Sequence, residues 1–576
     1  MIEHGDSGRN VCIPADEASG CITCSLSTAF GFSLTRLLEE RFRVLLQPVT
    51  VMRPLPSYPN MYEPGSPNIR LNMADRELIS TIKYVAGTKP VFSLSEILPY
   101  LHETLTIGEL FSSISADLPR LGLVAKKTGA DFVISRIPPV QSYILNEEEE
   151  KRLTAFLDSR ALPIVLEDHI EHYITKKVGK EWTDPLITER LRKAIVDQKN
   201  DYWKPAHRRS LRYTKGYSVL GYLAYHFPVY FMQTEHLLAQ LARDGLLKKS
   251  MTILDVGTGP GVVPLAIADF WSRLDNAQAA VYSLERSEEH IEAFLFLRDA
   301  FVPRGGNVSI KPPIKADITR PETAALPEKI DLIIFSNVLN ELTDASMDTR
   351  AAIVERIAER LSPDGTILIV EPADEENAIR MRTLTAELQK KGLSVYSPCS
   401  FIWGTPCTAP RCWSFLSAMY IRKTRLMEHL ARCDEPYRYV NTDIKYSYAF
   451  LRKDGLRKLA YRIGPGSKFL RLSKIHLHVG KRINVAGVKM SGELGDAKNH
   501  LFKICDGTAK TPVYAVLPSY HATPENEALR TAPYGAVLEM RGVLVRYNKE
   551  HDAYNLLVSR NTEIRMPETE MPEEDL

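Results

Sequence analysis

Three glycines in one short turn are the residues of this sequence best placed to bring a ligand against the main chain. Gly257, Gly259 and Gly261 follow an apolar run that ends at Asp255. This pattern predicts a strand, a tight turn and a helix. Glycine allows the sharp bend and a close approach, and the free amides at the start of a helix attract ligand groups. We therefore expect Asp255, Thr258 and the three glycines to belong to a ligand site.

Polar residues also stand where the following strands should end. Glu285 closes AAVYSLE, Asp317 follows a third predicted strand, DLIIFSNVLNEL runs into Asn337 and Asn340, and GTILIVE ends at Glu371. Strands alternating with helices predict a doubly wound α/β sheet, in which ligands bind at the carboxyl ends of the strands. The side chains that could do chemistry are therefore expected along one edge of that sheet.

The order of DVGTGPG, Glu285 and Asp317 resembles that of the class I S-adenosylmethionine-dependent methyltransferases. The resemblance implies that S-adenosylmethionine is the cofactor, with its methionine end at the glycine turn, its ribose at Glu285 and its adenine at Asp317. A dinucleotide-binding enzyme is the alternative, but it would be expected to show a full GxGxxG with a third glycine. The expected cofactor contacts are Asp255, Gly257, Thr258, Gly259, Gly261, Glu285, Asp317 and Asn337.

A second constellation is a loop at 398–415 that holds three cysteines within fourteen residues. Cys399, Cys407 and Cys412 occur among prolines and glycines that fold a loop back on itself. Such a loop can bring the sulfurs to one metal, and all-thiolate ligation suits an iron–sulfur cluster or zinc. Buried free thiols are the alternative, although a loop of this composition has little core to hide them. A fourth ligand must come from elsewhere in the chain.

A methyltransferase-like sheet with a cysteine loop between its last two strands, followed by YSYAFLRKDG, resembles the small-ribosomal-subunit assembly methyltransferase-like family. The family includes mitochondrial ribosome assembly factors that hold a four-iron cluster through four cysteines. The resemblance covers about residues 200–510, and SPC, PC, C and SYAFLRKDG are its most specific parts. It implies a [4Fe–4S] cluster. Zinc stays the alternative, because this chain has PCSF and Cys412-Trp413 where the family tends to have a PCPH-like start and a WC order.

The resemblance also bears on the fourth ligand. Cys505, in FKICDGT, resembles the family's distal cysteine, which also precedes an Asp-Gly turn, and we expect it to complete the centre. Cys433 is the less favoured candidate, since LMEHLARC predicts an amphipathic helix in which a buried thiol is the simpler interpretation. The amino-terminal Cys12, Cys21 and Cys24 include one CxxC, and a tail is favoured there over a zinc or redox site.

Two regions are expected to contact RNA. Residues 202–234 contain no acidic residue, and their cations interleave with Trp203, Tyr213 and Tyr217. Cations for phosphates and rings for bases suit an RNA-facing surface, the alternative being a helix neutralised by an acidic neighbour. Residues 468–566 alternate in pattern like the five strands of an OB-fold barrel, which either binds single-stranded nucleic acid or only braces the cysteine site. The expected RNA contacts are Lys204, Arg208, Arg209, Arg212, Lys215, Lys481 and Arg482.

Length and composition set the remaining limits. The 576 residues exceed one core, and 73 basic against 71 acidic residues leave a net charge of +2 that selects no partner. We expect a tail at 1–30, a mainly helical region at 31–200 with a winged helix at 92–137, a methyltransferase-like domain at 201–460, the barrel at 468–566 and an acidic tail at 567–576. The winged helix is interpreted equally well as a nucleic-acid module or a packing unit. No membrane span or targeting segment is visible, so a cytoplasmic location without a membrane or DNA partner is expected.

The reaction is the least determined part. Cytosine C5 chemistry needs a nucleophilic cysteine near the fourth or fifth strand, and no cysteine lies between Cys24 and Cys399. The turn of adenine amino methyltransferases after the fourth strand is absent too. Asn337, Asn340 and Glu341 are the candidates for placing another acceptor. Our first hypothesis is an RNA-binding, methyltransferase-like protein acting on small-subunit ribosomal RNA or in subunit assembly. An active methyltransferase on another RNA or a protein is second, and an iron–sulfur redox enzyme is third.

Overall fold

The computed structural model describes residues 78–567 apart from 79–80, 83–84, 86–90, 102–104, 116–117, 119–122, 137–141, 203–215, 321–325, 406, 408–411, 418–419, 460 and 465. The predicted amino-terminal tail with Cys12, Cys21 and Cys24 lies outside the described residues. So do the acidic end beyond Pro567 and five of the expected RNA contacts, namely Lys204, Arg208, Arg209, Arg212 and Lys215.

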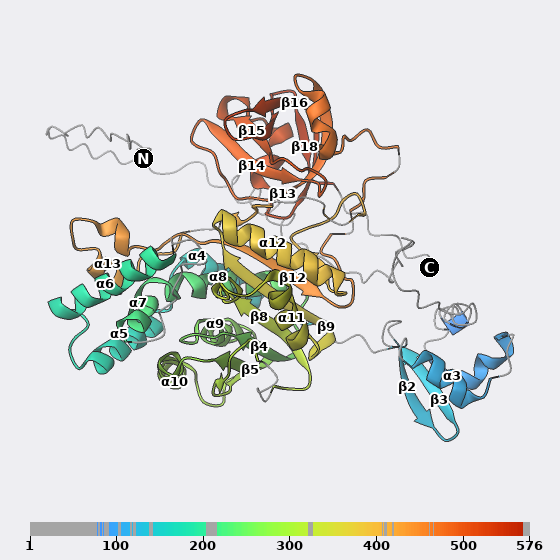
Figure 1. The fold of residues 1–576 in the computed structure, drawn as a ribbon, viewed down its shortest axis with the longest axis horizontal. Coiled ribbons are helices and arrows are strands. Elements are labelled where there is room, and N and C mark those ends of the chain that lie inside the picture. Colours follow the sequence, from blue (N-terminus) through green and yellow to red (C-terminus); the bar gives the residue numbers. More distant parts are fainter. Residues whose placement is uncertain are drawn as a thin grey trace, which may run out of the picture. The chain divides into compact units, whose positions relative to one another are not determined.

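One sheet of nine strands carries the predicted glycine turn (Figure 1). Its strands lie in the order β10-β12-β9-β8-β4-β5-β6, with β7 on β5 and β11 on β12. Every pair is parallel except those of β12, which runs antiparallel to its neighbours. This is the α/β sheet of a class I methyltransferase, as predicted. The strands are β4 (Ser250–Val256), β5 (Gln278–Glu285), β6 (Val308–Ile310), β7 (Ile314–Lys315), β8 (Ile330–Ser336), β9 (Leu361–Pro372), β10 (Ser394–Ser397), β11 (Leu416–Ser417) and β12 (Lys445–Arg452).

Two hydrophobic clusters cover the two faces of this sheet. Successive side chains of a strand point to opposite faces, so they belong to different clusters. Ile253 belongs to one hydrophobic cluster and its neighbour Leu254 to the other; Tyr448 and Ala449 divide in the same way. The first cluster takes in α8 (Phe227–Arg243), α9 (Val262–Trp271) and α10 (Glu288–Phe301), and the second takes in α11 (Met347–Ala358) and α12 (Glu375–Lys390). The sheet is therefore the buried middle layer, and polar side chains reach solvent mainly at its ends.

Helices before the sheet add to the first cluster. Buried side chains of α4 (Glu147–Ser159), α5 (Ile164–Val178) and α6 (Pro185–Tyr202) belong to it. The core thus extends into residues that the sequence places in the helical region at 31–200. The pattern of GYLAYHFPVYFMQTEHLLAQLA predicts amphipathic helix that leads into the first strand of the sheet. The structure forms two helices there, α7 (Tyr217–Tyr225) and α8. Pro228 is the physical reason, since it lacks an N–H and is tolerated only in the first turn of a helix.

The predicted winged-helix segment contains a three-stranded antiparallel sheet in the order β1-β3-β2. The expected β pieces are β2 (Leu123–Thr128) and β3 (Asp131–Arg136), which pair with β1 (Val91–Ser93). The sequence of this segment predicts three short helical periods before two β pieces. Of these periods, α3 (Ile107–Ile114) forms, whereas the first is replaced by β1 and two short 3-10 turns at Leu94–Glu96 and Leu98–Tyr100. Pro99 explains the difference, because it cannot supply an interior helical hydrogen bond.

The carboxyl-terminal strands close into the expected five-stranded barrel. β13 (Arg482–Lys489) pairs with β14 (Asn499–Cys505), β14 with β15 (Val513–Pro518), β15 with β17 (Ala553–Leu557), and β17 with β16 (Val537–Asn548), which returns to β13. α14 (Ala528–Thr531) lies between β15 and β16, and β18 (Glu563–Arg565) extends β16. The barrel has a hydrophobic core of its own.

In the part of the chain that is described, no helix is long and apolar enough to cross a bilayer.

Candidate cofactor pocket and cysteine cavity

The glycine turn joins β4 to α9 as predicted, and all three glycines have positive φ angles, 77° at Gly257, 55° at Gly259 and 89° at Gly261. Two of them are also required by packing. A Cβ on Gly257 would lie 2.4 Å from a methyl group of Val338, and one on Gly261 would lie 2.1 Å from the ring of Phe294. A side chain at either position would need both an unfavourable backbone conformation and displaced neighbours.

The amides of this turn are not bare, contrary to the sequence-based expectation. Gly257 and Thr258 donate to the carbonyl of Leu284, and Gly261 donates to that of Thr258. The amide of Gly259 donates to Oε2 of Glu285 at 2.8 Å. Because Pro260 has no N–H, every main-chain donor of the turn already has a protein acceptor. The turn therefore offers a ligand space and carbonyl oxygens rather than free donors.

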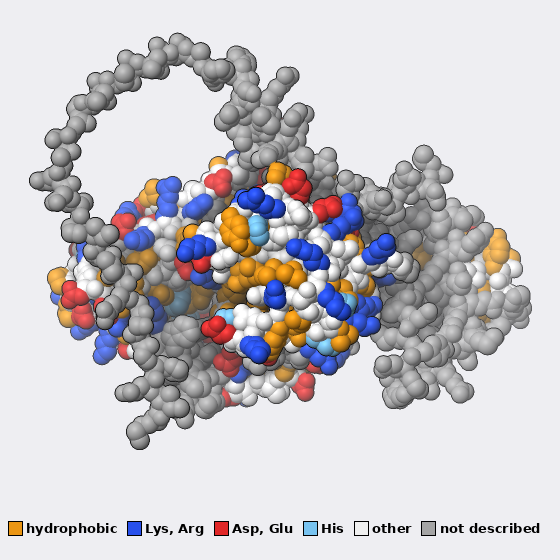
Figure 2. All heavy atoms as spheres, turned by 90° about the horizontal axis from the view of Figure 1, so that it is seen from above, with side chains coloured by type: hydrophobic (Ala, Val, Ile, Leu, Met, Phe, Trp, Pro, Cys, Tyr) orange, Lys and Arg blue, Asp and Glu red, His pale blue; other side chains and the backbone are white. Residues whose placement is uncertain are grey.

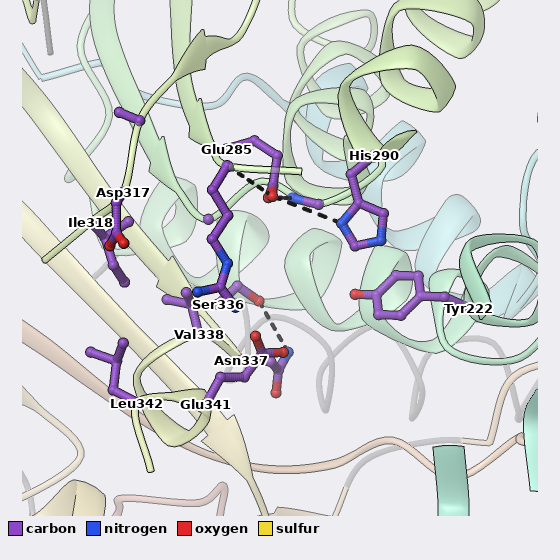
Figure 3. A pocket seen from close by; sticks show the side chains of 14 residues that line it. Tyr222, Glu285, His290, Asp317, Ile318, Ser336, Asn337, Val338, Glu341 and Leu342 are labelled. Carbon is purple, nitrogen blue, oxygen red and sulfur yellow. Dashed lines mark hydrogen bonds and ion pairs between the residues drawn. The ribbon is translucent and has the colours of Figure 1, made fainter. Parts of the chain in front are cut away.

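A cavity of about 90 Å³ opens beside this turn at the carboxyl ends of β4, β5 and β8. Figure 3 shows Tyr222 and His290 on one side of it, Asp317 and Ile318 on the other, and Asn337 and Glu341 nearby. Of the predicted cofactor contacts, Gly257, Gly259, Glu285, Asp317 and Asn337 line it. Asp255, Thr258 and Gly261 are not among the lining residues, and both Asp255 and Thr258 are buried.

Two of the three acidic side chains that line the pocket, Glu285 and Asp317, are held by local hydrogen bonds. Oε1 of Glu285 accepts the amides of Arg286 and Ser287 at 2.9 and 2.8 Å. Oδ1 of Asp317 accepts the amide and the hydroxyl of Thr319 at 2.9 and 2.8 Å. The hydrogen bond from the amide of Thr319 stabilises the charged form of Asp317, so the pKa of Asp317 is lowered. Asp317 thus faces the pocket as a fixed carboxylate.

Asn337 presents an unused acceptor. Its φ of 54° turns the chain sharply after β8, and its Nδ2 donates to Gln233 and Ser336 at 3.3 and 3.2 Å. Its Oδ1 is buried and has no hydrogen-bond partner within the described residues. A buried polar atom without a partner is costly, so a donor supplied by a ligand would satisfy it.

The three candidate catalytic residues do not converge. Glu341 lines the pocket beside Asn337, and burial raises its pKa to about 8, with the charge of Glu285 adding to the effect. Asn340 instead lines a separate small cavity with Glu371. Burial also raises the pKa of Asp255 to about 7 and that of Glu371 to about 8. Glu341 is thus mainly protonated near neutral pH and lines the pocket.

Sequence reasoning did not find two aromatic residues of the pocket. The rings of Tyr222, on α7, and His290, in the first turn of α10, have centroids 6.1 Å apart. Nδ1 of His290 lies 3.9 Å from Oε1 of Glu285. His290 follows Glu285 by five residues at a helix start, which is a usable signal. Tyr222 lies in an apolar helix and the sequence shows nothing that separates it from core tyrosines.

The four expected metal ligands line one further cavity of about 190 Å³. Cys399 follows β10, Cys407 and Cys412 belong to the loop, and Cys505 ends β14 of the barrel. The amide of Gly507 donates to the sulfur of Cys505 at 3.3 Å. Burial raises the pKa of Cys399 to about 12, and that of Cys505 well above its ordinary value. Among the side chains described, no three His, Cys, Asp or Glu stand close enough together to hold a metal ion.

Cys433 lies elsewhere. α13 (Arg425–Leu430) ends before it, so the amphipathic helix expected to carry this cysteine is shorter than predicted. Its sulfur contacts the carbonyl of Leu430 at 3.8 Å, and it does not line the cavity of the other four. The structure therefore brings Cys505, rather than Cys433, to the cysteine loop.

Two segments of the chain match models of known protein families. Residues 216–476 match the family model described as mitochondrial small ribosomal subunit Rsm22. This match covers less than half of the chain, and we refer to residues 216–476 as the Rsm22-family segment. The Rsm22-family segment contains the pocket and the whole cysteine loop. Residues 473–567 match the C-terminal domain of a domain of unknown function, DUF8157, and this segment contains Cys505.

Solved structures resemble the chain more distantly. The fibrillarin/Nop5p complex is 16% identical, with 36% of this chain and 74% of that chain covered and a TM-score of 0.22. TrmN from Thermus thermophilus is 14% identical, with 30% of this chain and 48% of that chain covered and a TM-score of 0.23. NSun6 from Pyrococcus horikoshii is 13% identical, with 36% of this chain and 48% of that chain covered and a TM-score of 0.23. The chain thus spans about half the length of the last two. No curated protein matches the chain in sequence.

Beyond the Rsm22-family segment, the barrel shows the two remaining predicted RNA contacts. Lys481 and Arg482 are exposed at the start of β13, where Arg482 donates to the carbonyl of Gly542 at 2.7 Å. Leu477 and Tyr520 are 61% and 69% exposed on the same domain. Figure 2 shows a face on which lysine and arginine side chains surround exposed hydrophobic ones. Such a surface can contact both phosphates and bases.

Proposed function

We propose that the pocket at the carboxyl ends of β4, β5 and β8 binds S-adenosylmethionine. The methionine end of the cofactor would lie against Gly257 and Gly259. Its ribose would lie at Glu285 and its adenine at Asp317. The buried Oδ1 of Asn337 fits the amino group of the methionine end, which is a donor. When bound, the cofactor supplies a methyl group on a sulfonium. The observation that carries this proposal is the position of the pocket, on the methyltransferase edge of the sheet and inside the Rsm22-family segment.

We propose further that the chain acts on small-subunit ribosomal RNA or on the assembling small subunit. The family description names the small ribosomal subunit, and the barrel exposes both cations and aromatic rings. The same description names mitochondria, so the site of action would be the compartment of that ribosome rather than the cytoplasm expected from the sequence. The basic stretch that ends at Lys215 would add a second contact.

Crosslinking in cells followed by sequencing of the bound RNA tests this role. We expect small-subunit ribosomal RNA to dominate. Joint replacement Lys481→Glu and Arg482→Glu should reduce its recovery several-fold and weaken the salt dependence of binding, because each lost phosphate contact lowers that slope by about one. Lys445→Glu, at an exposed lysine of the sheet domain, is the control and should change little. Recovery of no ribosomal RNA would reject the proposal.

The cysteine cavity supports a third element, a thiolate-held metal centre. Four cysteines line one cavity, and an amide already donates to the sulfur of Cys505, as amides do to metal-bound thiolates. We propose that Cys399, Cys407, Cys412 and Cys505 hold a [4Fe–4S] cluster, with zinc as the alternative. Either group would bind thiolates, so it would reverse the raised pKa values of these buried thiols. Because Cys505 comes from the barrel, such a centre would join two domains.

An active methyltransferase on another RNA or a protein is the second candidate, and Glu341 favours it. In its charged form, which predominates above about pH 8, a carboxyl group that lines the pocket can accept a proton from a nucleophile. Transfer of labelled methyl groups to purified small subunits, free RNA and protein fractions separates the two candidates. Incorporation that is lost in Glu341→Gln, while cofactor binding is kept, would establish catalysis.

A further inference from the structure

Arg382 is a buried cation for which the described residues supply no carboxylate partner. It lies on α12, where only 9% of its surface is exposed. Its Nε donates to Oγ of Ser414 at 2.9 Å, and its two terminal nitrogens donate to the carbonyl of Tyr448 at 2.8 Å and the hydroxyl of Tyr534 at 3.2 Å. All three acceptors are neutral, and no described carboxylate pairs with it. Burying a guanidinium without an anion costs several kcal/mol.

Another buried arginine of the same sheet shows the usual solution. Arg452 is 3% exposed at the end of β12. Its Nε donates to the carboxylate of Asp454 at 3.0 Å, and its other nitrogens bind Thr366 and the carbonyl of Asp364. This arginine therefore carries its own counter-ion, which Arg382 does not. The two side chains form a natural pair for comparison.

Two thiols of the cysteine loop also lie near Arg382. Arg382 lines the same cavity as Cys399 and Cys412. The sulfur of Cys412 lies 3.6 Å from Oγ of Ser414, which accepts the hydrogen bond from Arg382. A serine hydroxyl has one proton and two lone pairs, so it can accept from the guanidinium while donating to a thiolate. The contacts thus form a path from the cation to a sulfur of the loop.

Arg382 also joins the two domains that supply the cysteines. Its partners Ser414 and Tyr448 belong to the sheet domain, whereas Tyr534 precedes β16 of the barrel. A Cβ on the neighbouring Gly535 would lie 3.6 Å from Pro398, the residue before Cys399. The cation is therefore held at the point where Cys505 and the cysteine loop meet.

We propose that Arg382 is the built-in counter-ion of the thiolate centre, linked to Cys412 through Ser414 and to the barrel through Tyr534. This inference rests on the proposed metal centre. Four thiolates around a cluster or around zinc leave a net negative charge, and Arg382 places a fixed positive charge beside it. Arg382 is a positioning residue: it holds the loaded centre and, for an iron–sulfur cluster, favours the more negatively charged reduced state. Without metal, when the thiols are protonated, the same cation is unbalanced.

The test compares wild type with Arg382→Met and Arg382→Lys, purified anaerobically and loaded either with ferrous iron and sulfide or with zinc. Arg382→Met should release metal to a chelator at least tenfold faster, and its cluster should have a more negative midpoint potential. Its metal-free form should melt at or above the temperature of the wild type, because the unbalanced charge is gone. Arg382→Lys keeps the charge and should restore the potential and part of the retention.

Arg452→Met is the matched control. It should lower the melting temperature of the metal-free and the loaded protein alike and leave metal release unchanged. Arg382→Met could instead lower the melting temperature of both forms and leave the rate of metal release and the midpoint potential at their wild-type values. That result would show that Arg382 has only a structural role and would overturn the inference. A wild-type chain that takes up neither iron nor zinc would instead reject the proposed centre on which the inference rests.

Discussion

At the residue scale, the glycine turn shows that residue spacing predicts a backbone conformation but not the hydrogen-bond partners of its amides. Spacing alone predicted that Gly257, Gly259 and Gly261 form a tight turn, since strand ends and glycine clusters are local signals. It could not show that Glu285 occupies the amide of Gly259, because that contact spans 26 residues. Nor could it place Tyr222, which reaches the pocket through the packing of a distant helix.

Gly257→Ala tests the pocket at this scale. Its Cβ would meet Val338 at 2.4 Å, so the variant should lose at least tenfold in affinity for S-adenosylhomocysteine by calorimetry. Gly305→Ala is the matched control, because Gly305 has the same φ of 77° and nothing within 4 Å of the added Cβ. It should cost only about 1 kcal/mol of stability and leave binding intact. Equal binding by both variants would place the cofactor elsewhere.

Glu341 gives a pH-dependent prediction. Its pKa rises from 4.5 to about 8 on folding, so between these values the unfolded chain releases a proton that the folded chain keeps. Stability therefore falls as the pH rises through this window, and the penalty is complete above about pH 8. Glu341→Gln removes this contribution and should stabilise the protein at pH 8.5 by on the order of 1 kcal/mol or more, with little gain at pH 5.

Denaturant titrations at the two pH values measure the effect of Glu341→Gln. The exposed Glu359, replaced by glutamine, controls for the loss of a negative charge. If Glu341→Gln shows the same stability difference from wild type at both pH values, its carboxyl group does not titrate as the buried position requires.

At the element scale, strand periodicity predicted the sheet well because its strands are long apolar runs with polar ends. β5 ends at Glu285, and β10 and β12 are the two strands expected on either side of the cysteine loop. The failures have local chemical causes. Pro228 divides the helix expected before the sheet, and Pro99 prevents the first helix of the winged-helix segment. In both places the apolar period is right, but the missing proline N–H decides the outcome.

The contact between the sheet domain and the barrel gives an element-scale prediction. Phe415 pairs with Ser491, and a Cβ on Gly492 would lie 2.7 Å from the side chain and 2.9 Å from the carbonyl of Ser417. Gly492→Ala should therefore loosen the barrel and speed proteolysis of residues 453–470 several-fold. Gly464→Ala, with nothing within 4 Å of its Cβ, should not. Equal cleavage of both variants and wild type would mean that this contact does not hold the barrel.

At the scale of the whole molecule, the structure shows how segments far apart in the sequence share a core or a cavity. The barrel has its own core, whereas α4, α5 and α6 contribute to the core of the sheet domain. The cysteine cavity depends on both the sheet domain and the barrel, since Cys505 lies 93 positions beyond Cys412 in the chain. Spacing could identify the three loop cysteines, but only the resemblance to a family pointed to Cys505.

The most direct test of this account is the metal and sulfide content of the anaerobically purified chain, with its visible absorption, for wild type, Cys505→Ser and Cys433→Ser. Cys505 lines the cavity and Cys433 does not. We predict an iron–sulfur spectrum, or stoichiometric zinc, in wild type and Cys433→Ser, and its loss in Cys505→Ser. Full metal content in Cys505→Ser, or none in wild type, would contradict the claim that four cysteines from two domains hold one centre.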